Sequence, residues 1–103
     1  MSDEPIALPV KTVQEQEKVM ARAVEIFEEH TRQNGELWKT VDYIDTAHHI
    51  RHKAHRVYFA ARRLENGLSV VESRDRIVES ALDGINYSCF IIRQVEKNDE
   101  AVS

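Results

Sequence analysis

The stretch Val78-Glu-Ser-Ala-Leu-Asp-Gly-Ile-Asn-Tyr-Ser-Cys-Phe-Ile-Ile92 is the most informative part of this sequence. Its apolar residues recur at steps of three and four: Val78, Leu82, Ile85, Cys89 and Ile92. Such steps place side chains on one side of an α-helix, because the helix turns once in about 3.6 residues. The stretch therefore predicts an amphipathic helix with one continuous apolar stripe.

The other side of this predicted helix carries polar residues of a kind that bind cations. Glu79 and Asp83 are four residues apart, and Asn86 follows three residues later. At about 100° per residue, these three side chains share one face. Carboxylate oxygens are preferred ligands of Mg²⁺, so Glu79 and Asp83 are candidate metal ligands. A solvated helix face has the same spacing, and that alternative stays open.

The rest of the chain is also predicted to be helical. Its 103 residues suffice for one domain, and they include only three glycines and two prolines, Pro5 and Pro9. A hydrophobic share of 42% with 31% charged residues is typical of a globular chain. Asn34-Gly35 and Asn66-Gly67 are typical helix ends, because both residue types tolerate left-handed backbone.

These signals predict an all-α fold with three main helices in a bundle. Thr12 with Glu15, and Ser69 with Glu72, have the spacing of capping boxes that begin helices. The second helix is expected to run from about Asp42 to Glu65. We expect three segments: an extended N-terminal arm (1–11), a single all-α domain (12–97) and a frayed C-terminal tail (98–103).

The second helix has an unusually regular apolar seam. Its members step by 3, 4, 3, 4 and 3: Ala47, Ile50, Ala54, Val57, Ala61 and Leu64. Phe59 on this helix and Phe90 on the last lie opposite the aliphatic stripes. A helix with apolar groups on two sides contacts two partners, so we expect homodimerisation to complete the bundle.

Charge and cysteine content exclude several classes of function. A net charge of −4 argues against binding to duplex nucleic acid, which needs a basic surface. The single cysteine, Cys89, excludes an internal disulfide and fits a reducing compartment. The sequence has no signal peptide and no long apolar run, so we expect no membrane partner and a cytoplasmic location.

Basic residues gather on the second helix. Lys53 and Arg56 are candidate phosphate ligands, because cationic side chains neutralise phosphate and arginine binds it through paired N–H donors. The same charges could simply offset acidic neighbours. His48, His52 and His55 share a face that we interpret as solvated or interfacial, since no further ligands complete a zinc site.

Three short motifs resemble the MazG-like all-α group of nucleoside-triphosphate pyrophosphohydrolases and related phage nucleotide-modification-associated domains. They are Asn34-Gly-Glu-Leu-Trp38, Ile50-Arg-His-Lys-Ala-His-Arg-Val57 and Leu82-Asp-Gly-Ile-Asn-Tyr-Ser-Cys-Phe90. The resemblance covers residues 24 to 95. It rests on a Gly and a Trp after the first helix, a Lys-x-x-Arg on the second and an Asp-x-x-Asn-Tyr on the last.

The resemblance implies an all-α dimer that uses Mg²⁺ to split a nucleoside triphosphate into monophosphate and pyrophosphate. Glu79 and Asp83 would then hold Mg²⁺, Lys53 and Arg56 would contact phosphate, and Asn86 and Tyr87 would orient the sugar or base. The second helix lacks the Glu-Glu-x-x-Glu of the active enzymes. A further expectation is therefore that the protein binds a nucleotide without hydrolysing it. The alternative is a small helical protein that forms oligomers, interacts with partners and is not an enzyme.

Overall fold

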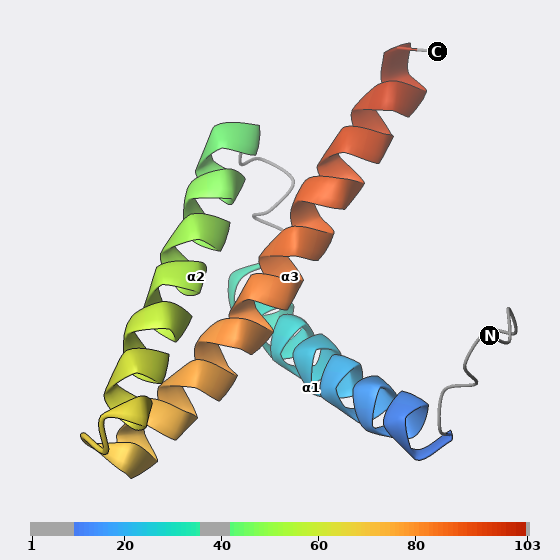
Figure 1. Ribbon diagram of the computed structural model, residues 1–103. Helices are drawn as coiled ribbons and strands as arrows, with labels where there is room; N and C mark the ends of the chain where they lie inside the picture. Colours follow the sequence, from blue (N-terminus) through green and yellow to red (C-terminus); the bar gives the residue numbers. More distant parts are fainter. Residues whose placement is uncertain (1–9, 36–41, 103) are drawn as a thin grey trace, which may run out of the picture.

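Three α-helices make up the fold. The computed structural model describes residues 10–35 and 42–102, which form α1 (Val10–Asn34), α2 (Tyr43–Glu65) and α3 (Val70–Val102). α2 and α3 form an antiparallel pair, and α1 crosses α3 on the side away from α2 (Figure 1). No strand occurs in these two ranges. The predicted all-α helical bundle is confirmed.

The helix ends follow the local chemistry of the sequence. α1 ends at Asn34, and Gly35 has a φ of +71°. After α2, Gly67 has a φ of +70°. This left-handed backbone is open to glycine because glycine has no Cβ. At the start of α2, the Asp42 side chain accepts a hydrogen bond of 2.9 Å from the backbone N–H of Asp45. The predicted ends of α1 and α2 are confirmed.

Two predicted boundaries are wrong. α1 begins at Val10, two residues before Thr12, and α3 continues to Val102, five residues beyond the predicted end at Lys97. Neither extension contains a glycine or a proline, so nothing in it stops the helix. Residues 1–9 of the predicted arm, and the linker residue Trp38, lie outside the described residues.

The contact between α2 and α3 includes small and polar residues at some of its most buried positions. On α2 these residues recur every seven positions: Thr46, Lys53 and Ala60. The partners on α3 include Ser80, which is buried, and Gln94, whose Oε1 accepts a 3.0 Å hydrogen bond from the Thr46 hydroxyl. A seven-residue repeat keeps one side of a helix against its neighbour.

The predicted apolar seams lie partly within this contact and partly beside it. Leu82 is buried, and five further members are half-buried: Ile50, Val57, Ala61, Leu64 and Ile85. The other five members are exposed: Ala47, Ala54, Val78, Cys89 and Ile92. The rotation of α2 against α3 also has to give buried polar groups their hydrogen-bond partners. The bond between Thr46 and Gln94 forms only when these two residues face each other. An apolar pattern alone does not reveal that constraint.

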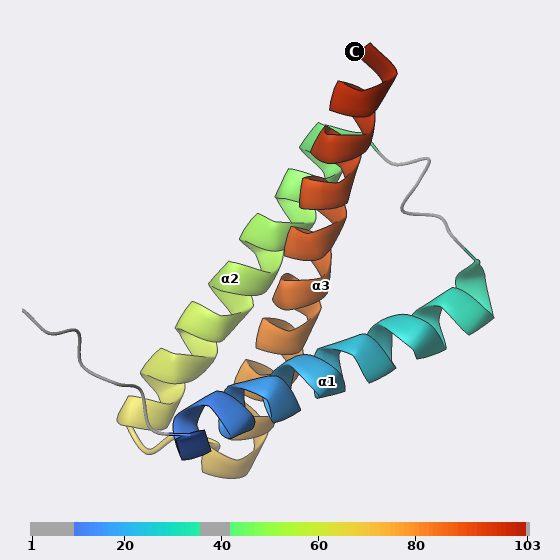
Figure 2. The ribbon, with the colours of Figure 1, turned by 90° about the vertical axis from the view of Figure 1, so that its right-hand side faces the viewer.

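α1 contacts α3 near the middle of both helices. The rings of Phe27 and Phe90 lie 5.5 Å apart between centroids, and the Asn86 amide donates a 2.9 Å hydrogen bond to the Ala23 carbonyl. The N-terminal half of α1 projects away from the other helices in Figure 1, and the C-terminal end of α1 projects from them in Figure 2. In the N-terminal half the apolar side chains of Val13 and Met20 are exposed.

Candidate functional site

Two of the predicted site residues form an ion pair with each other. The Nζ of Lys53 on α2 lies 3.0 Å from the Oδ2 of Asp83 on α3, and the side chains are 16% and 18% exposed. Lys53 was predicted to contact phosphate and Asp83 to bind a metal. Because the pair is mostly removed from water, each charge is compensated mainly by the other.

The second predicted metal ligand, Glu79, is exposed one turn before Asp83. In residues 10–35 and 42–102, no three His, Cys, Asp or Glu side chains come together in a group that could hold a metal. Glu79 and Asp83 therefore lack a third protein ligand of these types in the described part of one chain. Magnesium stays a prediction that an experiment has to test.

Asn86 and Tyr87 both lie in contacts between helices. The Asn86 amide holds α1 through the carbonyl of Ala23. The Tyr87 ring stacks on His49 of α2, with centroids 4.7 Å apart and an angle of 4° between the ring planes, and meets the Phe90 ring edge-on. These contacts give both side chains a role in packing, beside the nucleotide contacts predicted for them.

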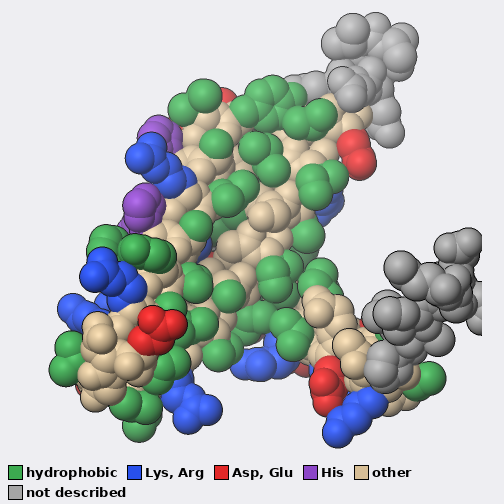
Figure 3. Space-filling view, in the orientation of Figure 1, with side chains coloured by type: hydrophobic (Ala, Val, Ile, Leu, Met, Phe, Trp, Pro, Cys, Tyr) green, Lys and Arg blue, Asp and Glu red, His purple; other side chains and the backbone are tan. Residues whose placement is uncertain are grey.

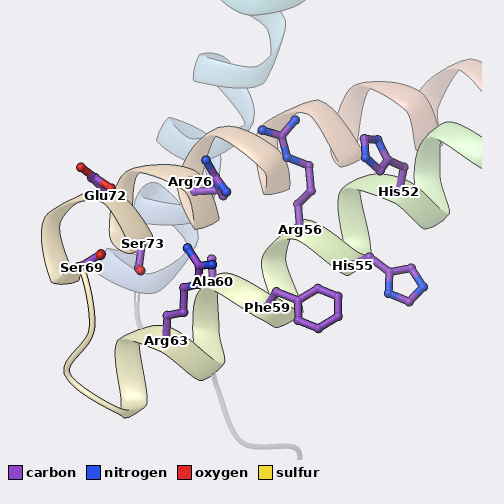
Figure 4. A pocket seen from close by; sticks show the side chains of 10 residues that line it. All are labelled: His52, His55, Arg56, Phe59, Ala60, Arg63, Ser69, Glu72, Ser73 and Arg76. Atoms are coloured by element: carbon purple, nitrogen blue, oxygen red, sulfur yellow. The ribbon is translucent and has the colours of Figure 1, made fainter.

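Arg56, the remaining predicted site residue, enters a pocket between α2 and α3 near the turn that joins them (Figure 4). We call it the arginine pocket, and its volume is about 380 Å³. Ten residues line it: His52, His55, Arg56, Phe59, Ala60, Arg63, Ser69, Glu72, Ser73 and Arg76. A pocket of this size accommodates a small phosphorylated molecule.

The arginine pocket is strongly cationic. Arg56 and Arg63 come from α2 and Arg76 comes from α3, so three guanidinium groups face the same space. None of the three has an ion-pair partner among the described residues. The one carboxylate of the lining, Glu72, points away from the arginines in Figure 4. Guanidinium groups left without a carboxylate are suited to bind an anion.

The first turn of α3 lies at the wall of the same pocket. Ser69 and Ser73 line the wall, and α3 begins between them at Val70. The first N–H groups of a helix have no partner within the helix, and the helix dipole makes this end attractive to negative charge. Ser69 has a φ of +45°, which is an unusual backbone conformation for a residue with a side chain.

An aromatic ring lies at the edge of the pocket. Phe59 is 57% exposed although it is a large apolar residue. Its ring stacks loosely on the imidazole of His55, with centroids 6.2 Å apart. Exposed rings beside cationic groups are typical of sites that hold a nucleotide base, because every base has a flat face that can stack.

The sequence placed Arg63 with Arg56 among the basic residues of the second helix, but only Lys53 and Arg56 were predicted as phosphate ligands, and Arg76 was not predicted as one. One signal was available: Arg56 and Arg63 are seven residues apart and so share one side of α2. Arg76 could not be added from the sequence, because its approach to α2 depends on how α3 folds back after Gly67.

Comparisons of the chain with protein-family models, curated proteins and solved structures found no match. No helix in the described ranges has the length and apolar character needed to span a bilayer.

Proposed function

We propose that this protein binds a nucleotide and that the arginine pocket receives its phosphate groups. The observation that carries the proposal is the meeting of Arg56, Arg63 and Arg76, without ion-pair partners among the described residues, at the N-terminal end of α3. Arginine binds phosphate through two parallel N–H donors, and three such groups suit a ligand with several negative charges.

A nucleotide fits the pocket better than a free phosphate ion does. The volume of about 380 Å³ exceeds what one phosphate needs and lies in the range of pockets for small organic ligands. Phe59 offers a surface on which a base can stack. The motif resemblance to the MazG-like group supports the same ligand class.

In this proposal the predicted residues have different roles. Arg56 contacts phosphate, as the sequence predicted. Three other predicted residues hold the helices in place around the pocket, because each contacts a neighbouring helix: Lys53, Asn86 and Tyr87. Magnesium-dependent pyrophosphohydrolysis requires Asp83 to leave Lys53 and to join Glu79 and further ligands. We therefore propose binding as the function and keep hydrolysis as a separate prediction.

The binding proposal is tested with a ligand panel in a calorimeter. The panel contains a nucleoside, its mono-, di- and triphosphates, and inorganic tripolyphosphate. We expect no binding of the nucleoside, affinity that rises with phosphate number, and weaker binding of tripolyphosphate than of the triphosphate. Arg63→Gln should weaken triphosphate binding at least about tenfold. Its neighbour Arg62 is outside the pocket, so Arg62→Gln serves as the control.

Two outcomes of these binding measurements would contradict the proposal. If no phosphorylated ligand binds the parent protein, or if Arg62→Gln and Arg63→Gln weaken binding equally, the pocket is not a nucleotide site.

We also propose that the chain forms a homo-oligomer in a reducing, cytoplasmic environment. The support for self-association is that only three apolar residues are buried in the described part of the chain, namely Ala23, Ala60 and Leu82. A chain of this size needs a larger core or a partner to be stable. The support for the environment is that Cys89 has no cysteine to pair with.

A further inference from the structure

An apolar groove runs between α2 and α3. Its volume is about 450 Å³, and most of its lining residues are aliphatic: Met20, Ile50, Lys53, Ala54, Val57, Ser80, Ala81, Gly84, Ile85, Ser88, Cys89 and Ile92. Figure 3 shows hydrophobic side chains gathered over this region, with charged and histidine side chains mainly at its borders. We call this surface the apolar groove.

The groove is lined by residues from the two most regular apolar patterns of the sequence. Ala54 and Val57 come from the predicted seam of α2, and Ile85, Cys89 and Ile92 come from the predicted stripe of α3. Among the buried residues of α2 and α3 in the described ranges, only Leu82 is a large apolar one, so much of these patterns stays partly or fully exposed. Regular apolar stripes are expected to be covered in the functional state of a helical protein.

The chain as a whole exposes more surface than a compact monomer of its size. Its accessible surface is 8454 Å², whereas a folded monomer of 11.9 kDa is expected to expose about 6,000 Å². A standard protein interface buries roughly 800 Å² on each partner, so this excess over the whole chain leaves room for one such interface.

The charge pattern of the groove favours a second copy of the same chain. The one charged side chain in its lining is Lys53, and the Asp83 carboxylate compensates it at 3.0 Å. Two copies related by a two-fold axis present identical surfaces to each other, so a charged surface would repel its copy. This groove is close to neutral, so it can face itself without that repulsion.

α1 adds a second wall to the same surface. Its N-terminal half projects beyond α3, and Met20 from this half lines the groove. Val13 and Val24 on this helix are also exposed. A partner that fills the groove would therefore also cover apolar side chains of α1.

We infer that the apolar groove is a homodimer interface, in which α2 and α3 of one copy pack on α2 and α3 of the other and against the projecting half of α1. This interface would be the surface through which the proposed homo-oligomer forms. It is separate from the proposed nucleotide site, because the arginine pocket and the groove share no lining residue.

The test substitutes one exposed groove residue and measures mass by light scattering over a concentration series. Ile92 is 55% exposed in the protomer, so Ile92→Glu leaves the fold of one chain intact. The matched control is Ile44→Glu, because Ile44 is 67% exposed on α2 and lies outside the groove lining. We expect twice the chain mass of 11.9 kDa for the parent and the control. For Ile92→Glu we expect a dimer dissociation constant at least tenfold higher, with unchanged helix content by circular dichroism.

A second readout uses the Cys89 thiol, which is exposed in the protomer and lines the groove. Its reaction rate with a thiol reagent should fall as the protein concentration rises through the dimerisation range. A parent that stays monomeric overturns the inference, whatever the reaction rate of Cys89. A dimer that tolerates Ile92→Glu as well as Ile44→Glu also overturns it. A monomer that binds nucleotide would leave the proposed function standing.

Discussion

The Nζ of Lys53 lies 3.0 Å from the Oδ2 of Asp83 and joins the middle of α2 to the middle of α3. With both side chains less than one-fifth exposed, this ion pair is mostly shielded from solvent. A shielded pair holds two helices in one relative rotation, because any other rotation leaves a charge without a partner in a poorly solvated place.

Removing one member of this pair should destabilise the protein. We expect Asp83→Asn to lower the free energy of unfolding by about 3 kcal/mol, because it leaves Lys53 charged and poorly solvated. The double variant Lys53→Met with Asp83→Leu should lose less than either single variant, since neither charge then remains. Urea unfolding of the parent and the variants in EDTA measures these differences. An Asp83→Asn variant more stable than the parent would instead favour a metal site at Asp83.

The hydrogen bond between Asn86 and Ala23 should govern the docking of α1. Asn86→Ala removes the donor to the Ala23 carbonyl and should cost about 1 kcal/mol. Because α1 then detaches more often, trypsin should cleave faster after Lys18 and Arg22. Mass spectrometry of timed digests measures this rate, and Glu96→Ala on the exposed side of α3 is the control. Equal digestion rates for all three proteins would contradict the role of Asn86.

The cap of α2 should contribute measurably to stability. Asp42→Ala removes the acceptor for the Asp45 backbone N–H and should lower the free energy of unfolding by about 1 kcal/mol. Asp42→Ser supplies another capping oxygen and should retain most of the parent stability. Thermal melts compare the three proteins. A serine variant as unstable as the alanine variant would show that Asp42 acts through its charge and not through the cap.

Nucleotide binding and metal dependence should be separable. In the proposed mode of binding, guanidinium groups of the arginine pocket hold the phosphates without a metal, so a triphosphate should still bind in EDTA. Calorimetry with and without Mg²⁺ measures binding, and a pyrophosphate assay measures hydrolysis in the same samples. Complete loss of binding in EDTA would contradict this account and would point to Glu79 and Asp83 as metal ligands.

The ends of the helices could be read from the sequence because they depend on local chemistry. Gly35 and Gly67 adopt the left-handed backbone that their Asn-Gly motifs predict. The rotation of α2 against α3 could not be read in this way. It depends on Thr46 meeting Gln94 and on Lys53 meeting Asp83, and both pairs join residues at least 30 positions apart in the chain.

The candidate site was predictable only in part for the same reason. Arg56 followed from the basic pattern of α2 and a short motif. Arg76 belongs to another helix, so its place in the arginine pocket depends on the α2–α3 pairing. Lys53 and Asp83 were assigned to different partners because nothing local shows that they meet.

The proposed function requires guanidinium groups from both α2 and α3 to bind the phosphates of a nucleotide. The most direct measurement is the dissociation constant of a nucleoside triphosphate for the parent, Arg76→Gln and Arg74→Gln, determined by calorimetry in EDTA. Both arginines lie on α3, but only Arg76 lines the pocket. The account predicts one site per chain in the parent, binding at least about tenfold weaker in Arg76→Gln, and parent-like binding in Arg74→Gln. Equal affinities for all three proteins would contradict it.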